Sequence, residues 1–454
     1  MKIRKKILAG GVIALSLLAV NIQAKVSPEE AAKLGAELTP LGAEKAGNAD
    51  GTIPEWTGGI KELPGSFQPG GTYPDPFPED EILFTINKGN MGDYASKLTD
   101  GQKAMLTRYP DYIIPVYKSR RTSNVPDSVY AAAKENATTV ELISGGNGLT
   151  KFNEANPFPI PQSGIEVIWN HITRYRGGAV KRNIGQVTPM ANGDYSVVRF
   201  QDELTWLDRL TDADKVDDPN VLFYFKQEIT SPSRLAGNVL LAHETIDQVK
   251  EPRRAWVYNA GQRRVRRAPQ VAYDGPGTAS DGLRTSDNFD MYNGSPDRYN
   301  WNLVGKQEIY IPYNSYKLAD PQYKYDNIIK AGHINQSLTR YELHRVWKVE
   351  GTLKEGVRHI YAKRVFYIDE DTWQAAEIDQ YDGRGELWRV SEAHAMSFYD
   401  KKVPWYAMEV IYDLQSQRYL ALGLMNEEQN PYTFDTQTSS GDFTPAALRS
   451  SGKR

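Results

Sequence analysis

The clearest helical pattern in the chain begins just after residue 162. Ile165, Ile168, Trp169 and Ile172 are spaced i, i+3, i+4 and i+7, which places them on one face of an amphipathic helix. The segment from Ser163 to Glu166 is expected to start this helix as a capping box. Because such an apolar face must lie against other apolar groups, we expect this helix to pack on the core of the segment that follows.

From Gly177 onward the period of the apolar positions changes to two, which is typical of β-strands. Short turns separate the strands and no crossover helix intervenes, so the sheet is predicted to be antiparallel and meandering. With the amphipathic helix in front of them, these strands predict a mainly β (α+β) fold, a highly curved sheet or unclosed β-barrel whose concave face is covered by helices. The expected strands are 178–188, 194–205, 220–231, 238–249, 253–259, 262–268, 304–312, 338–352, 357–369, 372–382, 385–399 and 405–419.

The segment 255–269 predicts a hairpin with its turn at Asn259–Gln262. If the turn centres on Ala260 and Gly261, Trp256 lies opposite Val265, and aromatic and guanidinium groups share a face. We expect that shared face to be the inner one. The residues expected on it are Trp256, Tyr258, Arg263, Val265 and Arg267.

A curved sheet with one apolar face either packs against a second layer or leaves a cavity for an apolar ligand. Each CH₂ group buried there would contribute roughly 0.8 kcal/mol. Arg263 and Arg267 are expected near the rim, where they could meet an anionic headgroup, while Arg264 and Arg266 point outward. The cavity residues predicted are Ile165, Ile168, Trp169, Ile172, Val198, Phe200, Phe223, Phe225, Trp256, Tyr258 and Val265.

The rest of the chain contains fewer strand patterns. We expect a signal peptide over 1–24, an extended and partly helical arm over 25–162 that is rich in Gly and Pro, a β domain over 163–430 and a polar tail over 431–454. Ser27 and Glu30 are expected to cap a first helix that runs to about Leu38. Further predictions are helices at 91–108 and 127–138, surface loops at 269–302 and 313–337, and a disordered or loosely capping tail.

The N-terminus has the pattern of an export signal. Lys2, Arg4, Lys5 and Lys6 precede an apolar run over 7–20, and a cleavage site is plausible near Ala24. No other stretch approaches the ~18–20 apolar residues that a membrane span needs. Together with the absence of Cys, this predicts a soluble, periplasmic protein of a Gram-negative bacterium, without disulfides or a lipid anchor attached to Cys.

The chain carries few signs of catalysis. It has 54 basic and 57 acidic residues, so no nucleic-acid partner is expected. His243-Glu244 begins a zincin pattern, but Asp247 stands where the second His is required. No Gly-x-Ser-x-Gly elbow occurs, and neither a cofactor nor a metal is expected. The carboxylate pairs Asp202/Glu203 and Glu377/Asp379 are expected to be solvated.

Three functions therefore remain open from the residues alone. The first is a non-enzymatic carrier or binding protein for a hydrophobic molecule. The second is a structural module whose packed sheet and long loops dock an outer-membrane partner. The third is an envelope hydrolase, because the two carboxylates of a glycosidase need not be neighbours in sequence.

Two motifs resemble a known family. The segment 38–59, which reads Leu-Thr-Pro-x-Gly-Ala-Glu-x-Ala-Gly-Asn-Ala-Asp-Gly-Thr-Ile-Pro-x-Trp-Thr-Gly-Gly, is similar to the N-terminal signature of the "domain of unknown function 1329" family. Trp256-Val-Tyr258 followed by Arg263-Arg-Val-Arg-Arg-Ala-Pro269 resembles that family and the wider outer-membrane lipoprotein-sorting group. The resemblance implies an unclosed β-barrel of the LolA/LolB type. It also implies trans-envelope transport of a lipid, lipoprotein or other hydrophobic molecule, with an inner-membrane transporter of the resistance-nodulation-division type and an outer-membrane β-barrel protein as partners.

Overall fold

The structure is a computed structural model that describes residues 25–150, 152–268 and 273–451. The predicted signal peptide lies outside the described residues. Within them, no helix combines the length and the apolar character that crossing a membrane requires.

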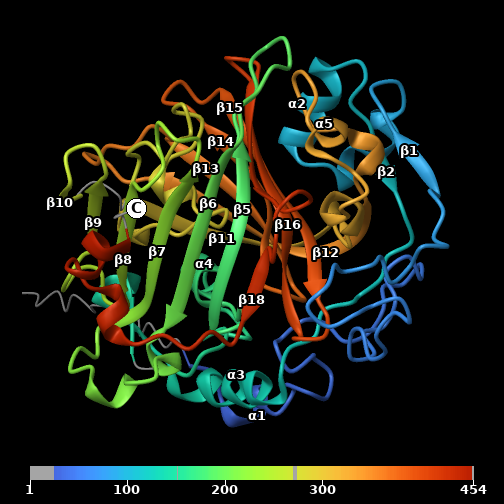
Figure 1. Cartoon of the computed structure of the whole chain (residues 1–454). Helices are drawn as coiled ribbons and strands as arrows, with labels where there is room; N and C mark the ends of the chain where they lie inside the picture. Colours follow the sequence, from blue (N-terminus) through green and yellow to red (C-terminus); the bar gives the residue numbers. More distant parts are fainter. Residues whose placement is uncertain (1–24, 151, 269–272, 452–454) are drawn as a thin grey trace, which may run out of the picture.

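Sixteen of the described strands form one large, curved sheet that is not closed (Figure 1). Along the sheet the order is β1-β2-β12-β13-β14-β15-β16-β17-β5-β6-β7-β8-β9-β10, while β11 pairs with β12 and β18 with β5. Neighbouring strands are antiparallel except at one parallel pairing of Tyr341 with Val116. The predicted fold class is thereby confirmed. The strands of the sheet are β1 (Phe84–Ile86), β2 (Ile114–Val116), β5 (Ala179–Val187), β6 (Val198–Trp206), β7 (Val221–Ser231), β8 (Val239–Thr245), β9 (Arg254–Asn259), β10 (Arg264–Arg267), β11 (Tyr299–Pro312), β12 (Tyr341–Leu353), β13 (Lys363–Asp369), β14 (Ala375–Tyr381), β15 (Leu387–Phe398), β16 (Val403–Asp413), β17 (Arg418–Leu424) and β18 (Tyr432–Phe434).

A separate two-stranded hairpin and six α-helices complete the main elements of the described chain. These are β3 (Leu142–Ile143) and β4 (Gly148–Leu149), and the helices α1 (Pro28–Ala31), α2 (Asp100–Arg108), α3 (Asp127–Thr139), α4 (Gly164–Thr173), α5 (Tyr325–Ile328) and α6 (Ala447–Ser451).

The predicted helix starts are only partly correct. Ser27 and Glu30 form the expected capping box, but α1 ends at Ala31 instead of near Leu38, and Gly35 has a left-handed φ of 86°. Thr99 and Gln102 form a second capping box at α2. The capping box predicted for α4 is wrong, because the Ser163 side chain makes no capping bond and Glu166 accepts from the backbone N–H of Gln162 instead.

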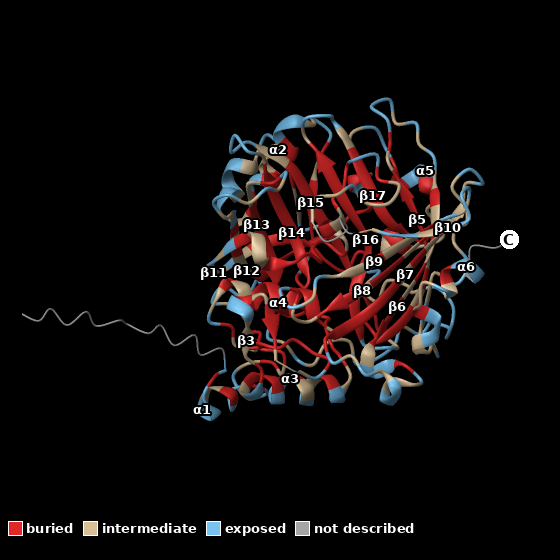
Figure 2. Ribbon diagram, turned by 90° about the vertical axis from the view of Figure 1, so that its left-hand side faces the viewer, coloured by how far each residue is buried: buried red, intermediate tan, exposed pale blue. Residues whose placement is uncertain are grey.

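The two faces of strands β6 to β9 are covered by different parts of the chain. The inner face carries Leu204, Phe225 and Ala242, which are cross-strand neighbours and belong to the same core as α4. The outer face carries Tyr224 and Leu241, which pack with the C-terminal segment. Figure 2 shows that β6, β7, β8 and α4 are mostly buried, whereas β9 is only partly buried.

Helix α4 lies on the inner side of the sheet and packs against β11 and β12. Gly164 allows this close approach, because a Cβ at that position would lie 3.0 Å from the backbone of residues 301–303. The indole N–H of Trp169 donates to the backbone oxygen of Gly146 at 2.9 Å. The apolar stripe therefore packs where the sequence pattern predicted.

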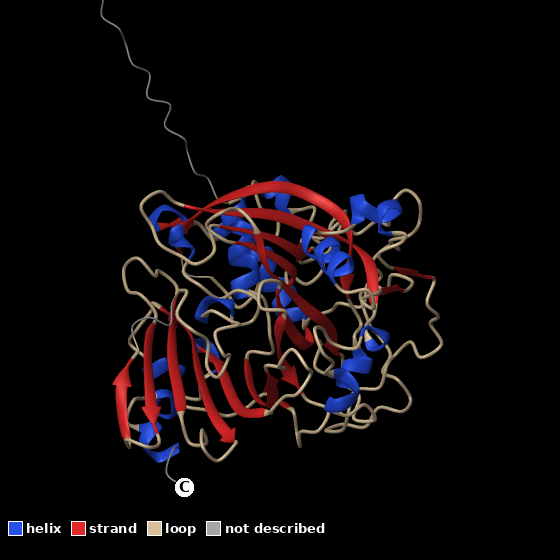
Figure 3. Ribbon diagram, turned by 90° about the horizontal axis from the view of Figure 1, so that it is seen from above, coloured by secondary structure: helices blue, strands red, loops and turns tan. Residues whose placement is uncertain are grey.

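The long loop between β10 and β11 is not the surface loop that its composition predicts. From Ser280 to Ser295 most of its side chains are buried, and seen from above the strands curve around an interior that holds loops and helices (Figure 3). Ion pairs make this burial possible, as described below. The segment 313–337 is buried in part: Tyr316 and Ile328 are almost fully enclosed, whereas Lys324 and Lys330 are exposed.

Two predicted boundaries near the C-terminus are wrong. The single strand expected at 405–419 is two strands, β16 and β17, because the Asp413 carboxylate accepts from the backbone N–H groups of Gln415 and Ser416 and so stabilises a turn. The tail is neither loose nor disordered within residues 431–450, since β18 pairs with β5 and Leu448 is fully buried.

The carboxylates expected to be solvated are mostly buried. On the face of the sheet that α2 covers, Glu377 accepts from the Thr99 hydroxyl at 3.0 Å and Asp379 accepts from the backbone N–H of Gly101 at 3.0 Å. Asp202 is 1% exposed and pairs with Arg182 at 2.7 Å. These carboxylates bind neighbouring parts of the chain, and so they stabilise the packing of the sheet against the elements that cover it.

Candidate functional site

The predicted cavity residues on α4 and the neighbouring strands form a packed core. Ile168, Trp169 and Ile172 are at most 1% exposed, and they share one apolar cluster with Phe223 and Phe225. Ile165 is half-buried against the same cluster. Val198 and Phe200 belong to an adjacent cluster with Ile184, Ile229 and Leu283.

The hairpin of β9 and β10 has a different register from the predicted one. Val265 lies opposite Tyr258, and Arg267 lies opposite Trp256, a shift of two residues from the prediction. The turn covers four residues, Ala260 to Arg263, because the Asn259 side chain accepts from the backbone N–H of Gln262. A shift of two leaves each side chain on its predicted face, so Trp256, Tyr258, Val265 and Arg267 do share one.

That shared face is nevertheless the outer one, so the predicted inner position of these residues is wrong. Trp256, Tyr258 and Val265 pack in the outer cluster with Phe443 and Leu448 of the C-terminal segment. The Arg267 guanidinium lies 5.9 Å from the Trp256 ring centre on this side, and Arg263 lies in the turn. By register, Arg264 and Arg266 share the inner face with Val257, opposite to our prediction, although all four arginines are exposed.

The inner face is filled by the chain itself, and buried ion pairs hold this filling in place. Asp290 of the long loop binds Arg174 at 2.6 Å and also pairs with Arg176, both at the end of α4. Burial opposes ionisation, but the two guanidinium groups outweigh it and hold the pKa of Asp290 below its usual range. Asp287 is bound in the same way by Arg364 at 2.7 Å and by His359 at 3.0 Å.

A cavity of about 690 Å³ lies beside this filled interior, at the ends of β6, β7 and β8. We call it the rim cavity. Residues from 143–150 and 152–154 form one wall, and the connections that follow β6 and β8 form the others. Its apolar lining consists of Ile143, Leu149, Phe152, Trp206, Leu207, Ala213, Pro219, Val221, Leu222 and Ile246.

Local contacts fix the shape of the rim cavity. The rings of Phe152 and Trp206 meet edge to face with centroids 6.3 Å apart. Asp247 connects the walls, since its carboxylate accepts from the Ser144 hydroxyl at 2.8 Å and its backbone N–H donates to the Asn220 side chain at 2.8 Å. Lys250, which is exposed, contributes a cation to the lining.

Two polar groups in the lining of the rim cavity lack a hydrogen-bond partner among the described residues: the indole N–H of Trp206 and one carboxylate oxygen of Glu154. The first is available to a ligand, and the second to a ligand or a proton. Both atoms are buried, and Glu154 binds Arg209 at 2.8 Å through its other oxygen. Burial raises the pKa of Glu154 to about 7 in spite of Arg209.

A second, smaller cavity of about 180 Å³ lies on the inner face between β7, β8, β9 and the long loop. We call it the inner pocket. Phe225, Leu240, Ala242 and Val257 line it from the sheet, and Phe289 and Arg284 from the loop. Phe225 is thus a predicted cavity residue that does line a cavity.

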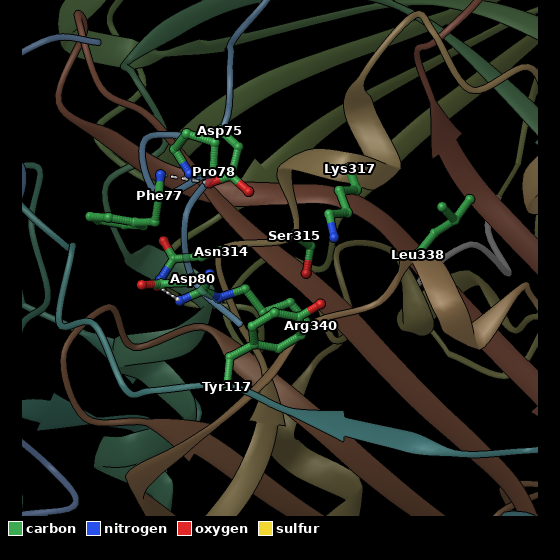
Figure 4. A pocket seen from close by; sticks show the side chains of 10 residues that line it. All are labelled: Asp75, Phe77, Pro78, Asp80, Tyr117, Asn314, Ser315, Lys317, Leu338 and Arg340. Carbon is green, nitrogen blue, oxygen red and sulfur yellow. Dashed lines mark hydrogen bonds and ion pairs between the residues drawn. The ribbon is translucent and has the colours of Figure 1, made fainter. Parts of the chain in front are cut away.

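Two other polar clusters do not form ligand sites. The hollow drawn in Figure 4, between Asp75, Asp80 and Arg340, measures about 20 Å³, which is the size of a water molecule. His344, Asp369 and Asp371 lie close enough together to suggest a metal site. However, Arg121 occupies Asp371 at 2.6 Å, and His344 is engaged by Glu342 at 3.1 Å.

Sequence reasoning missed the rim-cavity residues. They come from three separate parts of the chain, 143–150 with 152–154, 206–222 and 246–250, and two of these are turns and short elements without hydrophobic periodicity. The one usable signal was the isolated pair Trp206-Leu207 at the end of a predicted strand, where a large apolar side chain needs cover.

Comparisons with known proteins place the chain in a family. The family model described as "Protein of unknown function (DUF1329)" matches residues 85–449. The chain is 66% identical over 455 residues to "Uncharacterized protein PA3922" of Pseudomonas aeruginosa, and the match covers 100% of each protein.

Solved structures give weaker likenesses. A putative outer membrane lipoprotein-sorting protein domain from Vibrio parahaemolyticus matches with 14% identity over 63% of this chain and 98% of its own, with a TM-score of 0.43. A DUF1329 family protein from Desulfovibrio piger matches with 13% identity over 60% and 92%, with a TM-score of 0.42. The match to the family model over most of its length shows that the chain belongs to the DUF1329 family.

Proposed function

We propose that this protein is a non-enzymatic binding protein or carrier for a hydrophobic molecule, such as a lipid or the acyl part of a lipoprotein, and that the ligand occupies the rim cavity. The observation that carries the proposal is the size and lining of this cavity. Its volume of about 690 Å³ falls within the ~300–1,000 Å³ of small-molecule sites, which are likewise mostly apolar with a few polar groups.

The energetics favour an alkyl or ring-bearing ligand. Leu149, Trp206 and Leu222 are buried side chains that face this cavity, so a ligand there would exchange water for apolar contacts. Burial of each CH₂ group contributes roughly 0.8 kcal/mol. A chain of eight to ten such groups would therefore gain on the order of 6–8 kcal/mol before the cost of ordering.

The N-terminal sequence supports a place for this protein outside the cytoplasm. A basic start followed by an apolar run to Val20 supports export to the periplasm. There the protein would pass its ligand between an inner-membrane transporter of the resistance-nodulation-division type and an outer-membrane β-barrel protein.

A structural role is the second candidate, and the filled inner face favours it. Asp287 and Asp290 fix the long loop inside the sheet, so the central concavity that an unclosed barrel offers to a lipid is occupied. In this alternative the rim cavity would hold only water, and the protein would act as a rigid docking module.

Binding of a fluorescent fatty acid, measured together with native mass spectrometry of protein purified from the periplasm, separates the two candidates. Ala213 lines the rim cavity, and Ala213→Trp should fill it and weaken probe binding at least tenfold. The matched control is Ala131→Trp on the exposed side of α3. This variant should bind the fluorescent fatty acid as tightly as the wild type does. A protein that carries no hydrophobic species and ignores the probe would refute the carrier function.

A further inference from the structure

Arg284 is an unusual residue for the interior of a sheet, because it is a buried cation that forms no ion pair with the described residues. Arg284 is 3% exposed, and its Nε has no hydrogen-bond partner among the described residues. No ion pair of its guanidinium with a described carboxylate is present either, whereas the nearby Arg253 is bound by Glu244 at 2.7 Å. A buried charge without an ion-pair partner is costly, so an anion bound beside Arg284 would relieve that cost.

The guanidinium of Arg284 is held in place by its surroundings. The backbone N–H of Gly277 donates to the Arg284 carbonyl at 2.8 Å, and a Cβ on Gly277 would lie 2.9 Å from the Arg284 Nε. The Phe289 ring lies 5.9 Å from the guanidinium carbon. The side chain therefore packs against the backbone of Gly277 and lies beside the Phe289 ring, which limits its conformational freedom and so the entropy that binding an anion would cost.

The inner pocket adds an apolar chamber next to this cation. Its wall is made by Phe225, Leu240, Ala242 and Val257 of the sheet. At about 180 Å³, the pocket is somewhat larger than the ~150 Å³ apolar cavity that accommodates a benzene molecule. A single ring or a short acyl chain fits this volume, whereas a diacyl lipid does not.

The pocket can also be reached from solvent. Pro276 in its lining is exposed, and Leu240, Val257 and Phe289 are half-buried. The other charged groups of the lining, Glu244 and Arg253, bind each other, so they leave Arg284 as the charge available to a ligand in this described lining.

We propose that the inner pocket is a binding site for a small amphipathic acid, in which Arg284 receives the carboxylate and the wall of Phe225, Leu240 and Val257 receives a ring or short acyl chain. The planar guanidinium donates two parallel hydrogen bonds to a carboxylate. This site is separate from the rim cavity and does not depend on the function proposed for it.

Isothermal titration calorimetry of the full mature chain tests the site with hexanoate and benzoate against their neutral isosteres, hexanamide and benzamide. The acids should bind about 10- to 100-fold more tightly than the amides, because a charge-assisted hydrogen bond is worth about 1.5–3 kcal/mol. Equal affinities of acid and amide, or no binding of either acid at millimolar concentration, would overturn the proposal. Inorganic phosphate should bind more weakly than hexanoate, and equally tight phosphate binding would contradict the apolar half of the site.

Two variants test whether Arg284 causes the preference for the acids over the amides. Arg284→Met removes the charge but keeps an unbranched apolar side chain, so it should abolish the preference for acid over amide. Because this change removes a buried charge, it should also raise the melting temperature of the ligand-free protein, and that measurement shows that the variant is folded. Arg267→Met, at an exposed arginine on the outer face, should keep the preference. An Arg284→Met protein that still prefers the acids would refute the assignment.

Testing each variant with the ligand of the other site distinguishes the two sites. Ala213→Trp should leave hexanoate binding unchanged, and Arg284→Met should leave binding of the fluorescent fatty acid unchanged. If Ala213→Trp weakened hexanoate binding by tenfold or more, hexanoate would occupy the rim cavity, and the inner-pocket site would be refuted.

Discussion

Glu154 illustrates how burial at the wall of the rim cavity changes the chemistry of one residue. Its side chain is 3% exposed, and burial raises its pKa from 4.5 to about 7. A carboxyl whose pKa is higher in the folded state stabilises the fold at pH below about 4.5, and this contribution is lost as the pH rises through 7. Glu154 therefore destabilises the protein at pH 8 relative to pH 5.

Glu154→Gln should remove this dependence. At pH 8 we expect the variant to be more stable than the wild type by roughly 1–3 kcal/mol, because the amide needs no ionisation. At pH 4 the two proteins should be similar. Urea unfolding at both pH values measures the difference, and Glu62→Gln at an exposed position is the control. A variant that is less stable at pH 8 would show that the pair with Arg209 outweighs the burial of the carboxylate.

At the scale of elements, the long loop between β10 and β11 determines what the sheet can enclose. Its carboxylates bind arginines at the end of α4 and on β13, so the loop and the helix fill the inner face together. The predicted curved, unclosed sheet is present, but its central concavity is not free for a ligand.

Asp290→Ala should show the strength of this attachment. The change leaves Arg174 and Arg176 buried without their shared carboxylate, and losing one partner of a buried ion pair typically costs about 3–5 kcal/mol. Asp281→Ala in the same loop is the control, because Asp281 is exposed and its pair with Arg418 lies at the surface. We expect it to cost less than about 1 kcal/mol. Equal shifts of the urea midpoint in the two variants would contradict the role of Asp290.

Elements with a clear periodicity could be predicted from the sequence, and those fixed by long-range ion pairs could not. The stripe of α4 and most strands from β5 to β16 follow from spacing alone. The loop 273–298 is rich in Gly, Asp and Asn and looks solvated, and only the positions of Arg174, Arg176 and Arg364 in space explain its burial. The face of Trp256 was assigned wrongly because alternation shows which residues share a face, but not which face the C-terminal segment covers.

At the scale of the whole molecule, the rim cavity lies where three parts of the chain meet. Residues 143–150 and 152–154 lie between α3 and α4 in the chain. Trp206 and Leu222 are at the ends of neighbouring strands, and Ile246 follows β8. A ligand there would contact all three parts, and binding should therefore stabilise the folded protein as a whole.

The most direct test of this account is a crystal structure of the protein soaked with a terminally brominated fatty acid, using the anomalous signal of bromine to locate the chain end. We predict a bromine peak inside the rim cavity, between Phe152, Trp206 and Leu222. A peak at another place in the molecule, or no ordered bromine at a concentration that saturates the fluorescent probe, would contradict the assignment of the ligand to the rim cavity.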